Sequence, residues 1–578
     1  MTAGREESVE PVQVQPVELR VLTGPNLYFL RPAVKLTLDA TAALAADAGV
    51  MLGWQQVIAP TSSTVGMPGS DARAQAVADL AAALVRRVAS GIRRRVPAVG
   101  RPGADGTVIA AFPFKHRDLA EAFGEAVAAA FGAVTEQGVP PRTAIAAARQ
   151  RLRDIPVGPI LRPLRPTIPV IAVTGTNGKT TTTRLISHLV RTWGRVPGWS
   201  STDGIVIDGE IVETGDWSGP GGAARVLEDP RVQVAVTETA RGGILLRGIG
   251  LAANDVSVVT NISPDHLGTL GVHTVEQLAE VKSVVPRITK PTGWAVLNGD
   301  DDLVYAMRTV TRARVWLYSA DPENPRLAAV LDVGGRGMTV LDGEIVVLER
   351  GLDPVRVIDV TLVPLTLGGA SRVNLSNVLA ATAAALGIGC DLATVRAGLS
   401  SFAGDAAHNA GRLNTYLAGP SVAESTVVIL DLAHNEASLE SLLEVGTAFR
   451  RPGGELVTIV GTAGDRPDEA IHAMGSIAAR HADRVVIADK EKYLRGREPG
   501  EMAELWRSGA TEAGVVEVPE FPDELSALRA LLDADLPPGS AIAVCTLEQR
   551  LETIDELTAR GGHELTPAEI VERVSGQA

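Results

Sequence analysis

The 578-residue sequence has only two cysteines, Cys390 and Cys545, which lie far apart in apolar surroundings. No pair or cluster of cysteines with metal-ligand spacing exists, which argues against a cysteine-based zinc site or a disulfide framework. We therefore expect two buried thiols.

Long apolar runs and an excess of basic residues are also missing. No apolar run approaches the ~18 residues that suggest a membrane-spanning helix, and the start of the chain does not have the pattern of a signal peptide. The net charge of −14 and the pI near 5.3 argue against general nucleic-acid binding, because a phosphate backbone attracts basic surfaces. We expect a cytoplasmic protein with no nucleic-acid or membrane partner.

The composition is that of a folded, multi-domain protein. Apolar residues make up 45% of the chain and charged residues 21%, which is ordinary for a globular protein. Five prolines in segment 156–169 predict an extended connector, and segment 404–411 has no periodicity. The predicted parts are a flexible leader (1–16), an amino-terminal domain (17–160), a central domain (161–408) and a carboxy-terminal domain (409–578).

Hydrophobic patterns predict an α+β amino-terminal domain followed by two α/β domains. The first domain combines strands at 17–22 and 107–112 with Ala-rich helices at 72–90 and 118–131. Short apolar runs typical of parallel strands buried on both faces then recur, with helical patterns between them. They lie at 170–174, 232–237, 256–260 and 294–298 in the central domain, and at 427–431, 456–460, 484–488 and 541–545 in the last. We expect a doubly wound central sheet and a Rossmann-like carboxy-terminal sheet.

The strongest chemical motif follows the strand at 170–174 and reads Gly175-Thr176-Asn177-Gly178-Lys179-Thr180. Glycines let backbone N–H groups converge on phosphate oxygens beside a helix N-terminus, lysine adds positive charge, and a threonine hydroxyl can bind magnesium. The spacing is shorter than GxxxxGK[ST]. A glycine turn that only packs strand against helix is the alternative, but it would not require the lysine and threonine.

This short loop resembles that of the Mur ligase family, and within it most closely the carboxy-terminal half of the cyanophycin synthetases. Leu22-Thr-Gly-Pro-Asn26 also resembles the start of their amino-terminal domain. The matching central segments are Ser201-Thr-Asp-Gly-Ile-Val-Ile-Asp-Gly209, Gly215-Asp-Trp-Ser-Gly-Pro220, Glu238-Thr-Ala-Arg-Gly-Gly-Ile-Leu245, Asn261-Ile-Ser-Pro-Asp-His-Leu-Gly268 and Val296-Leu-Asn-Gly-Asp-Asp301. In cyanophycin synthetases an ATP-grasp domain separates these two parts, whereas here only the proline-rich connector does.

The resemblance implies a three-domain, ATP-dependent ligase that joins a small-molecule or peptide acceptor to an amino acid or amine. The amide bond would form through an acyl phosphate, with release of ADP and phosphate. The implied cofactors are ATP and two Mg²⁺ ions. The implied catalytic residues are Lys179, Glu238, His266, Lys282 and Arg412; the metal-binding residues are Thr180, Glu238, His266 and Lys282; and the nucleotide-binding residues are Gly175, Thr176, Asn177, Gly178, Lys179, Thr180, Thr181, Asn374, Asn377, Arg412 and Asp431. Lys282 occupies the place of a lysine that is carbamylated in many Mur ligases.

Each of these roles has a plain structural alternative. Glu238 could cap a helix, His266 could be structural, and Lys282 could be a surface lysine on an amphipathic helix. Asn374 and Asn377 could cap the Ala-rich helix that follows, and Arg412 could be an exposed loop residue.

At the level of function, a peptidoglycan-precursor or folylpolyglutamate-type ligase would share the same catalytic centre. A nucleotide-binding regulator without activity is the alternative from another class. Association with a further copy of the chain or with a partner ligase also remains open.

Overall fold

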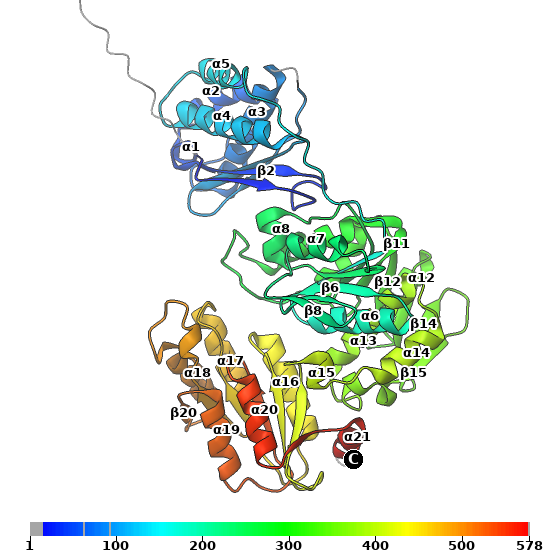
Figure 1. Cartoon of the computed structure of the whole chain (residues 1–578). Helices are drawn as coiled ribbons and strands as arrows, with labels where there is room; N and C mark the ends of the chain where they lie inside the picture. The colour runs from blue at the N-terminus through cyan, green and yellow to red at the C-terminus, as the bar shows by residue number, and fades with distance from the viewer. Residues whose placement is uncertain (1–15, 62–63, 92–93, 576–578) are drawn as a thin grey trace, which may run out of the picture. The chain divides into compact units, whose positions relative to one another are not determined.

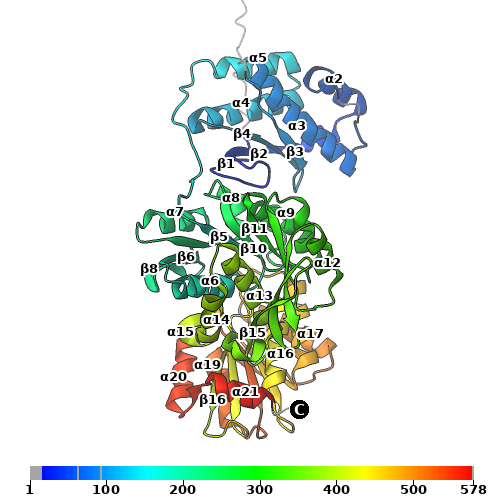
Figure 2. The same cartoon turned by 90° about the vertical axis from the view of Figure 1, so that its right-hand side faces the viewer.

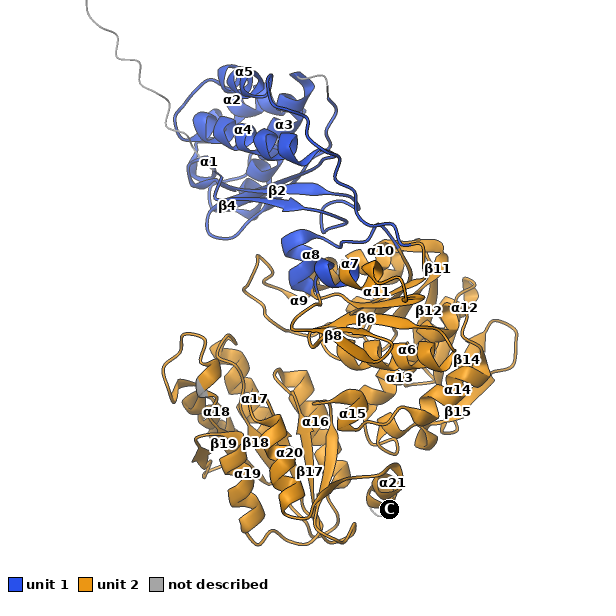
Figure 3. Ribbon diagram, viewed as in Figure 1, with its two compact units in different colours: residues 1–166, 219–224, 241–253 blue, residues 167–218, 225–240, 254–578 orange. Residues whose placement is uncertain are grey.

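The structure is a computed structural model that describes residues 16–61, 64–91 and 94–575 (Figure 1). All but the last residue of the predicted leader therefore lies outside the described residues. Contacts divide the chain into two compact units (Figure 3). Unit 1 comprises 1–166, 219–224 and 241–253, and unit 2 comprises the remainder. Unit 1 thus takes in three short segments, 161–166, 219–224 and 241–253, from the range that the sequence assigns to the central domain.

Unit 1 is an α+β fold with one antiparallel sheet in the order β1-β2-β4-β3. Alternate residues of β2 and β4, such as Leu36 and Ala110, are buried beneath α3 and α4. The strands are β1 (Glu18–Leu22), β2 (Ala33–Asp39), β3 (Val99–Pro102) and β4 (Thr107–Pro113), and the helices are α1 (Thr41–Ala45), α2 (Ala48–Ile58), α3 (Asp71–Gly91), α4 (Arg117–Thr135), α5 (Pro141–Arg151) and α8 (Arg241–Arg247). The connector is anchored within this unit by a bridge between Leu164 and Leu251.

The central sheet of unit 2 has eleven strands in the order β15-β14-β13-β12-β11-β10-β5-β9-β6-β7-β8. The strands from β13 to β6 in this order are parallel, and antiparallel hairpins extend both edges. The strands are β5 (Val170–Thr174), β6 (Pro197–Ser201), β7 (Gly204–Ile207), β8 (Glu210–Thr214), β9 (Val234–Glu238), β10 (Asn254–Val259), β11 (Thr289–Asn298), β12 (Arg314–Tyr318), β13 (Arg336–Leu341), β14 (Glu344–Glu349) and β15 (Val355–Asp359).

Helices cover the central sheet, and α6, α13 and α14 lie together over one face (Figures 1 and 2). Strand β5 lies between β9 and β10, so the loop after it opens at the edge where ligands gather in open α/β sheets. The helices are α6 (Lys179–Thr192), α7 (Pro220–Glu228), α9 (Val275–Lys282), α10 (Val284–Arg287), α11 (Asp302–Ala306), α12 (Pro325–Asp332), α13 (Arg372–Gly387), α14 (Leu392–Ser401) and α15 (Ala406–Asn409).

A third sheet, in the order β20-β19-β18-β21-β17-β16-β22, completes unit 2. Along β17, Val427 and Ile429 pack under α16, α17 and α18, whereas Val428 and Leu430 pack under α19 and α20. The strands are β16 (Asn414–Ala418), β17 (Thr426–Asp431), β18 (Leu456–Val460), β19 (Arg484–Ala488), β20 (Glu520–Phe521), β21 (Ala541–Cys545) and β22 (His563–Glu564), and the helices are α16 (Glu436–Phe449), α17 (Asp468–His481), α18 (Glu501–Glu512), α19 (Glu524–Asp533), α20 (Arg550–Ala559) and α21 (Pro567–Ser575). Both predicted α/β sheets are therefore confirmed.

Helix α21 is fastened to this sheet by Arg573, whose side chain is fully buried. The guanidinium donates to the carbonyl oxygens of Phe449, Val422, Ala423, Gly539 and Ser540. Burial and the neighbouring Arg451 lower the pKa of Arg573 to about 10. One side chain thus holds together several loops at the same end of the sheet.

Two smaller predictions can be checked against the fold. Cys390 and Cys545 are free and buried, as expected, and burial raises the pKa of each thiol to about 12. Among the described residues, no helix is both long enough and apolar enough to span a bilayer.

Candidate functional site

The phosphate loop joins β5 to α6 in a conformation that requires glycine at two positions. Gly175 and Gly178 have φ values of 150° and 83°. A Cβ atom on Gly175 would collide with the Thr260 hydroxyl, and one on Gly178 would collide with the Asn377 amide oxygen. The loop is therefore pressed closely against the end of β10 and the start of α13.

Hydrogen bonds from the segment after β10 fix the backbone of this loop. The Asn177 N–H donates to Asn261 Oδ1 over 2.9 Å, and the Ser263 N–H donates to Thr176 Oγ1 over 3.1 Å. Lys179 Nζ donates to the Thr176 carbonyl oxygen over 2.7 Å, which folds the lysine side chain back over the loop. The predicted strand, glycine turn and helix are thus present and rigidly braced.

Glu238 ends β9 beside the loop and is 2% exposed. Its Oε2 accepts a hydrogen bond from Thr180 Oγ1 over 3.0 Å, whereas its buried Oε1 has no hydrogen-bond partner. Burial raises the pKa of Glu238, and the charge of Lys179 and the Thr180 hydrogen bond oppose that rise. A carboxylate with a spare oxygen beside a threonine hydroxyl fits Mg²⁺, which prefers hard oxygen ligands.

Lys282 lies at the end of α9, is 4% exposed and donates from Nζ to the Gly175 carbonyl oxygen over 2.6 Å. The alternative of a surface lysine is therefore wrong. The lysine supports the phosphate loop directly, which places it within the predicted site.

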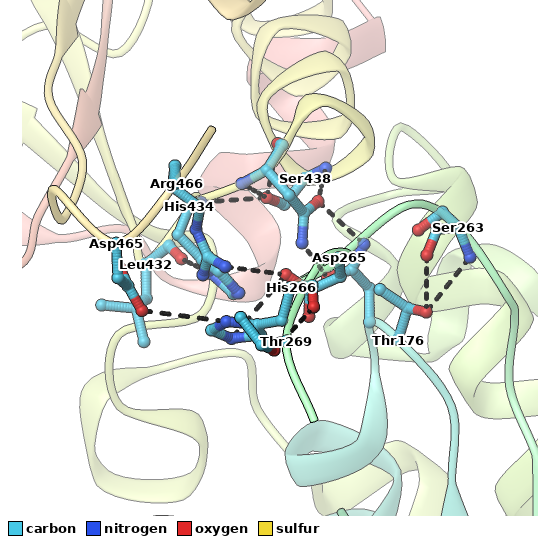
Figure 4. Close-up of polar contacts among 12 residues, drawn as sticks. Thr176, Ser263, Asp265, His266, Thr269, Leu432, His434, Ser438, Asp465 and Arg466 are labelled. Atoms are coloured by element: carbon cyan, nitrogen blue, oxygen red, sulfur yellow. Dashed lines mark hydrogen bonds and ion pairs between the residues drawn. The ribbon is translucent and has the colours of Figure 1, made fainter. Parts of the chain in front are cut away.

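His266 follows β10 in a left-handed backbone conformation, with φ of 51°, and lies against two carboxylates. Its Nδ1 is 3.8 Å from Asp465 Oδ2, and its Nε2 is 3.9 Å from Asp265 Oδ1 (Figure 4). Arg466 pairs with Asp265 over 3.1 Å. Burial alone would raise the pKa of Asp265, but the nearby His266 and Arg466 outweigh it and lower that pKa. No group of three or more His, Cys, Asp or Glu side chains in the described chain is arranged to hold a metal ion.

A cavity of about 110 Å³ brings together nearly all the predicted nucleotide-binding residues. Its lining comes from the phosphate loop, the start of α13 and segments around β16, β17 and α16. The lining residues are Thr176, Asn177, Gly178, Lys179, Thr180, Thr181, Val373, Asn374, Asn377, Arg412, Leu413, Asp431, Leu432, His434, Ser438 and Ser441. Gly175, Glu238, His266 and Lys282 lie outside this lining. Gly175 nevertheless begins the loop that forms it, and Glu238 and Lys282 donate to or accept from residues of that loop.

Asn374 and Asn377 are buried in the first turns of α13 and do not cap it. Ser371 is the N-cap residue, and its Oγ accepts from the Asn374 N–H over 3.2 Å. Asn377 Nδ2 donates to Asn374 Oδ1, and Asn377 Oδ1 accepts from Thr182 Oγ1. The capping alternative is wrong, and the two amides instead connect α13 to α6 at the cavity.

Arg412 and Asp431 approach the cavity from the third sheet, and Arg412 is half-buried rather than an exposed loop residue. Asp431 Oδ2 accepts from the Leu413 N–H over 2.9 Å. Burial raises the pKa of Asp431 to about 6, although Arg412 and the Leu413 N–H work in the opposite direction. Burial lowers the pKa of His434 to about 4, so its imidazole is neutral at neutral pH.

Sequence reasoning missed the residue that joins this side to the phosphate loop. Asn177 and Asn435 exchange two amide hydrogen bonds, of 3.1 and 3.0 Å. Asn435 also caps α16. A polar residue before a helix indicates such a cap, but nothing local in the sequence indicates its partner 258 residues away.

Arg497, in the segment between β19 and α18, braces a neighbouring turn of the third sheet. It donates to the carbonyl oxygens of Gly464 and Arg466, over 2.9 and 2.7 Å, and pairs with Asp468 and Glu501. It therefore holds the glycine-rich turn that carries Asp465 and Arg466.

Comparison with known proteins matches the two halves of unit 2 to defined domains. Residues 173–385 match the Mur ligase middle domain, and residues 411–546 match the Mur ligase glutamate ligase domain. The chain is 41% identical over 367 residues to the cyanophycin synthetase of Synechocystis sp., which is 63% of this chain and 41% of that protein. The chain thus spans about two fifths of the length of this relative.

Two further comparisons concern other ligases. The UDP-N-acetylmuramoyl-L-alanyl-D-glutamate--2,6-diaminopimelate ligase of Synechococcus elongatus is 30% identical over 393 residues, which is 65% of this chain and 71% of that protein. The structure of E. coli FolC in complex with DHPP and ADP superimposes on 69% of this chain and 90% of that chain, with 18% identity and a TM-score of 0.49. On the domain matches and the sequence identities, this chain belongs to the Mur ligase family.

Proposed function

We propose that this protein is an ATP-dependent ligase that forms an amide bond between a carboxylate acceptor and an amino acid or amine. The observation that carries the proposal is the cavity, where Lys179 and Thr180 meet Arg412 and Asp431 from the other sheet. A regulator without activity would not require the buried Glu238 carboxylate that contacts Thr180.

The chemistry explains why ATP is needed. A carboxylate is a poor electrophile, so the acceptor oxygen first attacks the γ-phosphorus of ATP and ADP leaves. The resulting acyl phosphate is attacked at its carbonyl carbon by an amine, which loses a proton as inorganic phosphate departs. One ATP is consumed for each amide bond.

The residues of the site divide this work between positioning and charge neutralisation. Lys179 and Arg412 would neutralise the transferring phosphoryl group, and Asp431 would accept hydrogen bonds from ribose hydroxyls. Thr180 and Glu238 would hold Mg²⁺, which supplies charge neutralisation at the β- and γ-phosphate oxygens when bound. A second ion held by His266 and a carbamylated Lys282 remains a prediction.

The size of the cavity implies that nucleotide entry needs movement. Its volume of about 110 Å³ is smaller than the roughly 300–1,000 Å³ of ordinary ligand sites. We expect the Asp431 segment to move away from the phosphate loop when ATP enters and to return before transfer. Return would also exclude water that could hydrolyse the acyl phosphate.

An ATPase assay with a panel of amino acids and short dipeptides tests the proposal. A ligase should release ADP only when a suitable acceptor and amine are both present. Mass spectrometry should then find one product equal to their summed mass minus one water. ADP release that ignores every added substrate, with no new amide, would contradict the proposal.

The number of activation sites gives a second test. In cyanophycin synthetases two ATP sites are understood to alternate, one extending an aspartate backbone and the other attaching arginine to its side chains. Only one phosphate loop is recognisable here, so we expect no polymer from aspartate, arginine and ATP alone. Polymer on a sizing gel without another protein would overturn this one-site prediction.

A further inference from the structure

Arg184 lies on α6, the helix that begins at the phosphate loop, and its side chain is only 11% exposed. Its guanidinium donates to Asp203 Oδ2 over 2.8 Å. It also donates to Asn409 Oδ1 over 3.2 Å and to the Ala410 carbonyl oxygen over 3.3 Å. One buried cation therefore ties α6 to the turn after β6 and to the segment that leads into the third sheet.

That segment reaches the nucleotide cavity two residues later, at Arg412. The Arg412 N–H donates to the Asn409 carbonyl oxygen over 3.2 Å, and Asn409 Nδ2 donates to Thr181 Oγ1 over 3.3 Å. From the other side, Asp431 accepts the Leu413 N–H. The backbone at Arg412 is thus fixed by α6 on one side and by β17 on the other.

Arg184 itself is absent from the lining of the nucleotide cavity, whereas Arg412 is part of it. Arg184 would therefore affect phosphoryl transfer mainly by holding Arg412 in place. Its geometry suits this task, because a planar guanidinium can reach several oxygens at fixed angles and a lysine ammonium cannot reproduce that fork.

We propose that Arg184 is a positioning residue that holds segment 409–412 against α6, so that Arg412 points at the phosphates of bound ATP. This inference rests on the proposed function and adds a residue that couples the third sheet to the phosphate loop. Asp203 keeps the Arg184 guanidinium in place.

A double-mutant cycle tests the coupling. Arg184→Met, Arg412→Met and the double variant are compared in the full chain for kcat, for KM of ATP, and for affinity toward a non-hydrolysable ATP analogue. Misplacing a catalytic group by about 1 Å can cost about 100-fold, so we expect Arg184→Met to lower kcat/KM by about 10- to 100-fold. The double variant should be no worse than Arg412→Met alone, since Arg184 has nothing left to position.

Two further variants separate geometry from charge and from folding. Arg184→Lys keeps the charge and should still lose most of the activity. Arg191→Met is the matched control, because Arg191 lies on the same helix, is 59% exposed and pairs with Asp208; its activity should stay within about twofold of wild type. Melting temperatures are measured for all variants. If Arg184→Met does not fold, Asp203→Asn replaces it in the cycle.

Losses that add in the double variant, or full activity of Arg184→Lys, would overturn the positioning role. If the wild-type protein binds the ATP analogue but never releases ADP, the proposed reaction is refuted. The role of Arg184 would still be decided by the double-mutant cycle, with affinity for the analogue as the measured quantity. Failure to bind the analogue at all would overturn both.

Discussion

The two walls of the nucleotide cavity are built differently. The phosphate wall, residues 176–181, is one continuous stretch of loop and helix whose backbone is braced by Asn261 and Ser263. The opposite wall, residues 412–441, reaches the cavity through segments flanking β16 and β17, and meets the phosphate loop through side chains such as Asn435. We expect the first wall to place charge at the reacting phosphates and the second to control how firmly the nucleotide is held. Variants in the two walls should therefore fail in different ways.

The largest effect should come from Lys179→Ala in the phosphate wall. It removes positive charge where the phosphoryl group transfers, and losing one such group costs about 10²- to 10³-fold in kcat. Lys179 is half-buried, so the change opens no core cavity and the melting temperature should hold. ADP release is the measurement, and Lys115→Ala, an exposed lysine of unit 1, is the control. Unchanged turnover would refute the phosphate site.

Lys282→Ala tests how much activity depends on the lysine that supports the phosphate loop from outside the cavity. Loss of its contact with the Gly175 carbonyl should lower kcat by about 10- to 100-fold, as for other residues that orient a metal site. If Lys282 is carbamylated, added short-chain carboxylic acids should restore part of the activity of Lys282→Ala. Absence of rescue at saturating acid would favour the unmodified lysine seen against Gly175.

Asp431→Ala tests the opposite wall and should shift affinity more than chemistry. Loss of hydrogen bonds to a carboxylate should raise KM for ATP by about 10-fold, and kcat should fall less than this, because the Leu413 N–H beside Arg412 also loses its acceptor. Steady-state kinetics with varied ATP separates the two constants. A fall in kcat at unchanged KM would argue against ribose binding. It would also mean that variants in the two walls do not differ in which constant they change.

The smallest effect should be a pH dependence carried by Asp431. Its carboxyl, with a pKa of about 6, becomes protonated as the pH falls through that value, so KM for ATP should rise several-fold between pH 7 and 5. In Asp431→Asn this rise should disappear.

Unfolding caused by protonation of Asp431 would not explain the rise in KM for ATP at low pH. A folded-state pKa above the ordinary 3.8 gives stability that is present below pH 3.8 and lost as the pH rises through about 6. Acidification to pH 5 therefore does not destabilise the protein through Asp431. Melting curves at both pH values check this.

The phosphate wall could be predicted from the sequence because its determinants are local. An apolar β-branched run followed by glycines, lysine and threonine specifies strand, turn and helix, and β5 has the predicted bounds. The strands β18, β19 and β21 also have their predicted bounds, because buried parallel strands are short apolar runs.

The hairpins at both edges of the central sheet were missed. Strand β8, for example, consists largely of exposed residues and carries no apolar run. The opposite wall was predictable only in part, through resemblance. The hydrogen bonds of Asn435 to Asn177, and of Arg184 to Asn409, join residues more than 200 positions apart. No periodicity or spacing encodes such pairs, and they follow only from the packing of two sheets.

The position of the buried Arg573 near the end of the chain affects the order in which the domains fold during synthesis. Domains tend to fold in order as a chain emerges from the ribosome. The central sheet is complete long before the third sheet receives the guanidinium that binds its carbonyl groups. Arg573 is synthesised 151 residues after Val422, whose carbonyl oxygen it binds. At a synthesis rate of 5–20 residues per second, this delay is roughly 8 to 30 s. We expect the nascent third sheet to expose apolar strands and unsatisfied loop carbonyls during that interval, and we expect chaperones to bind the chain then.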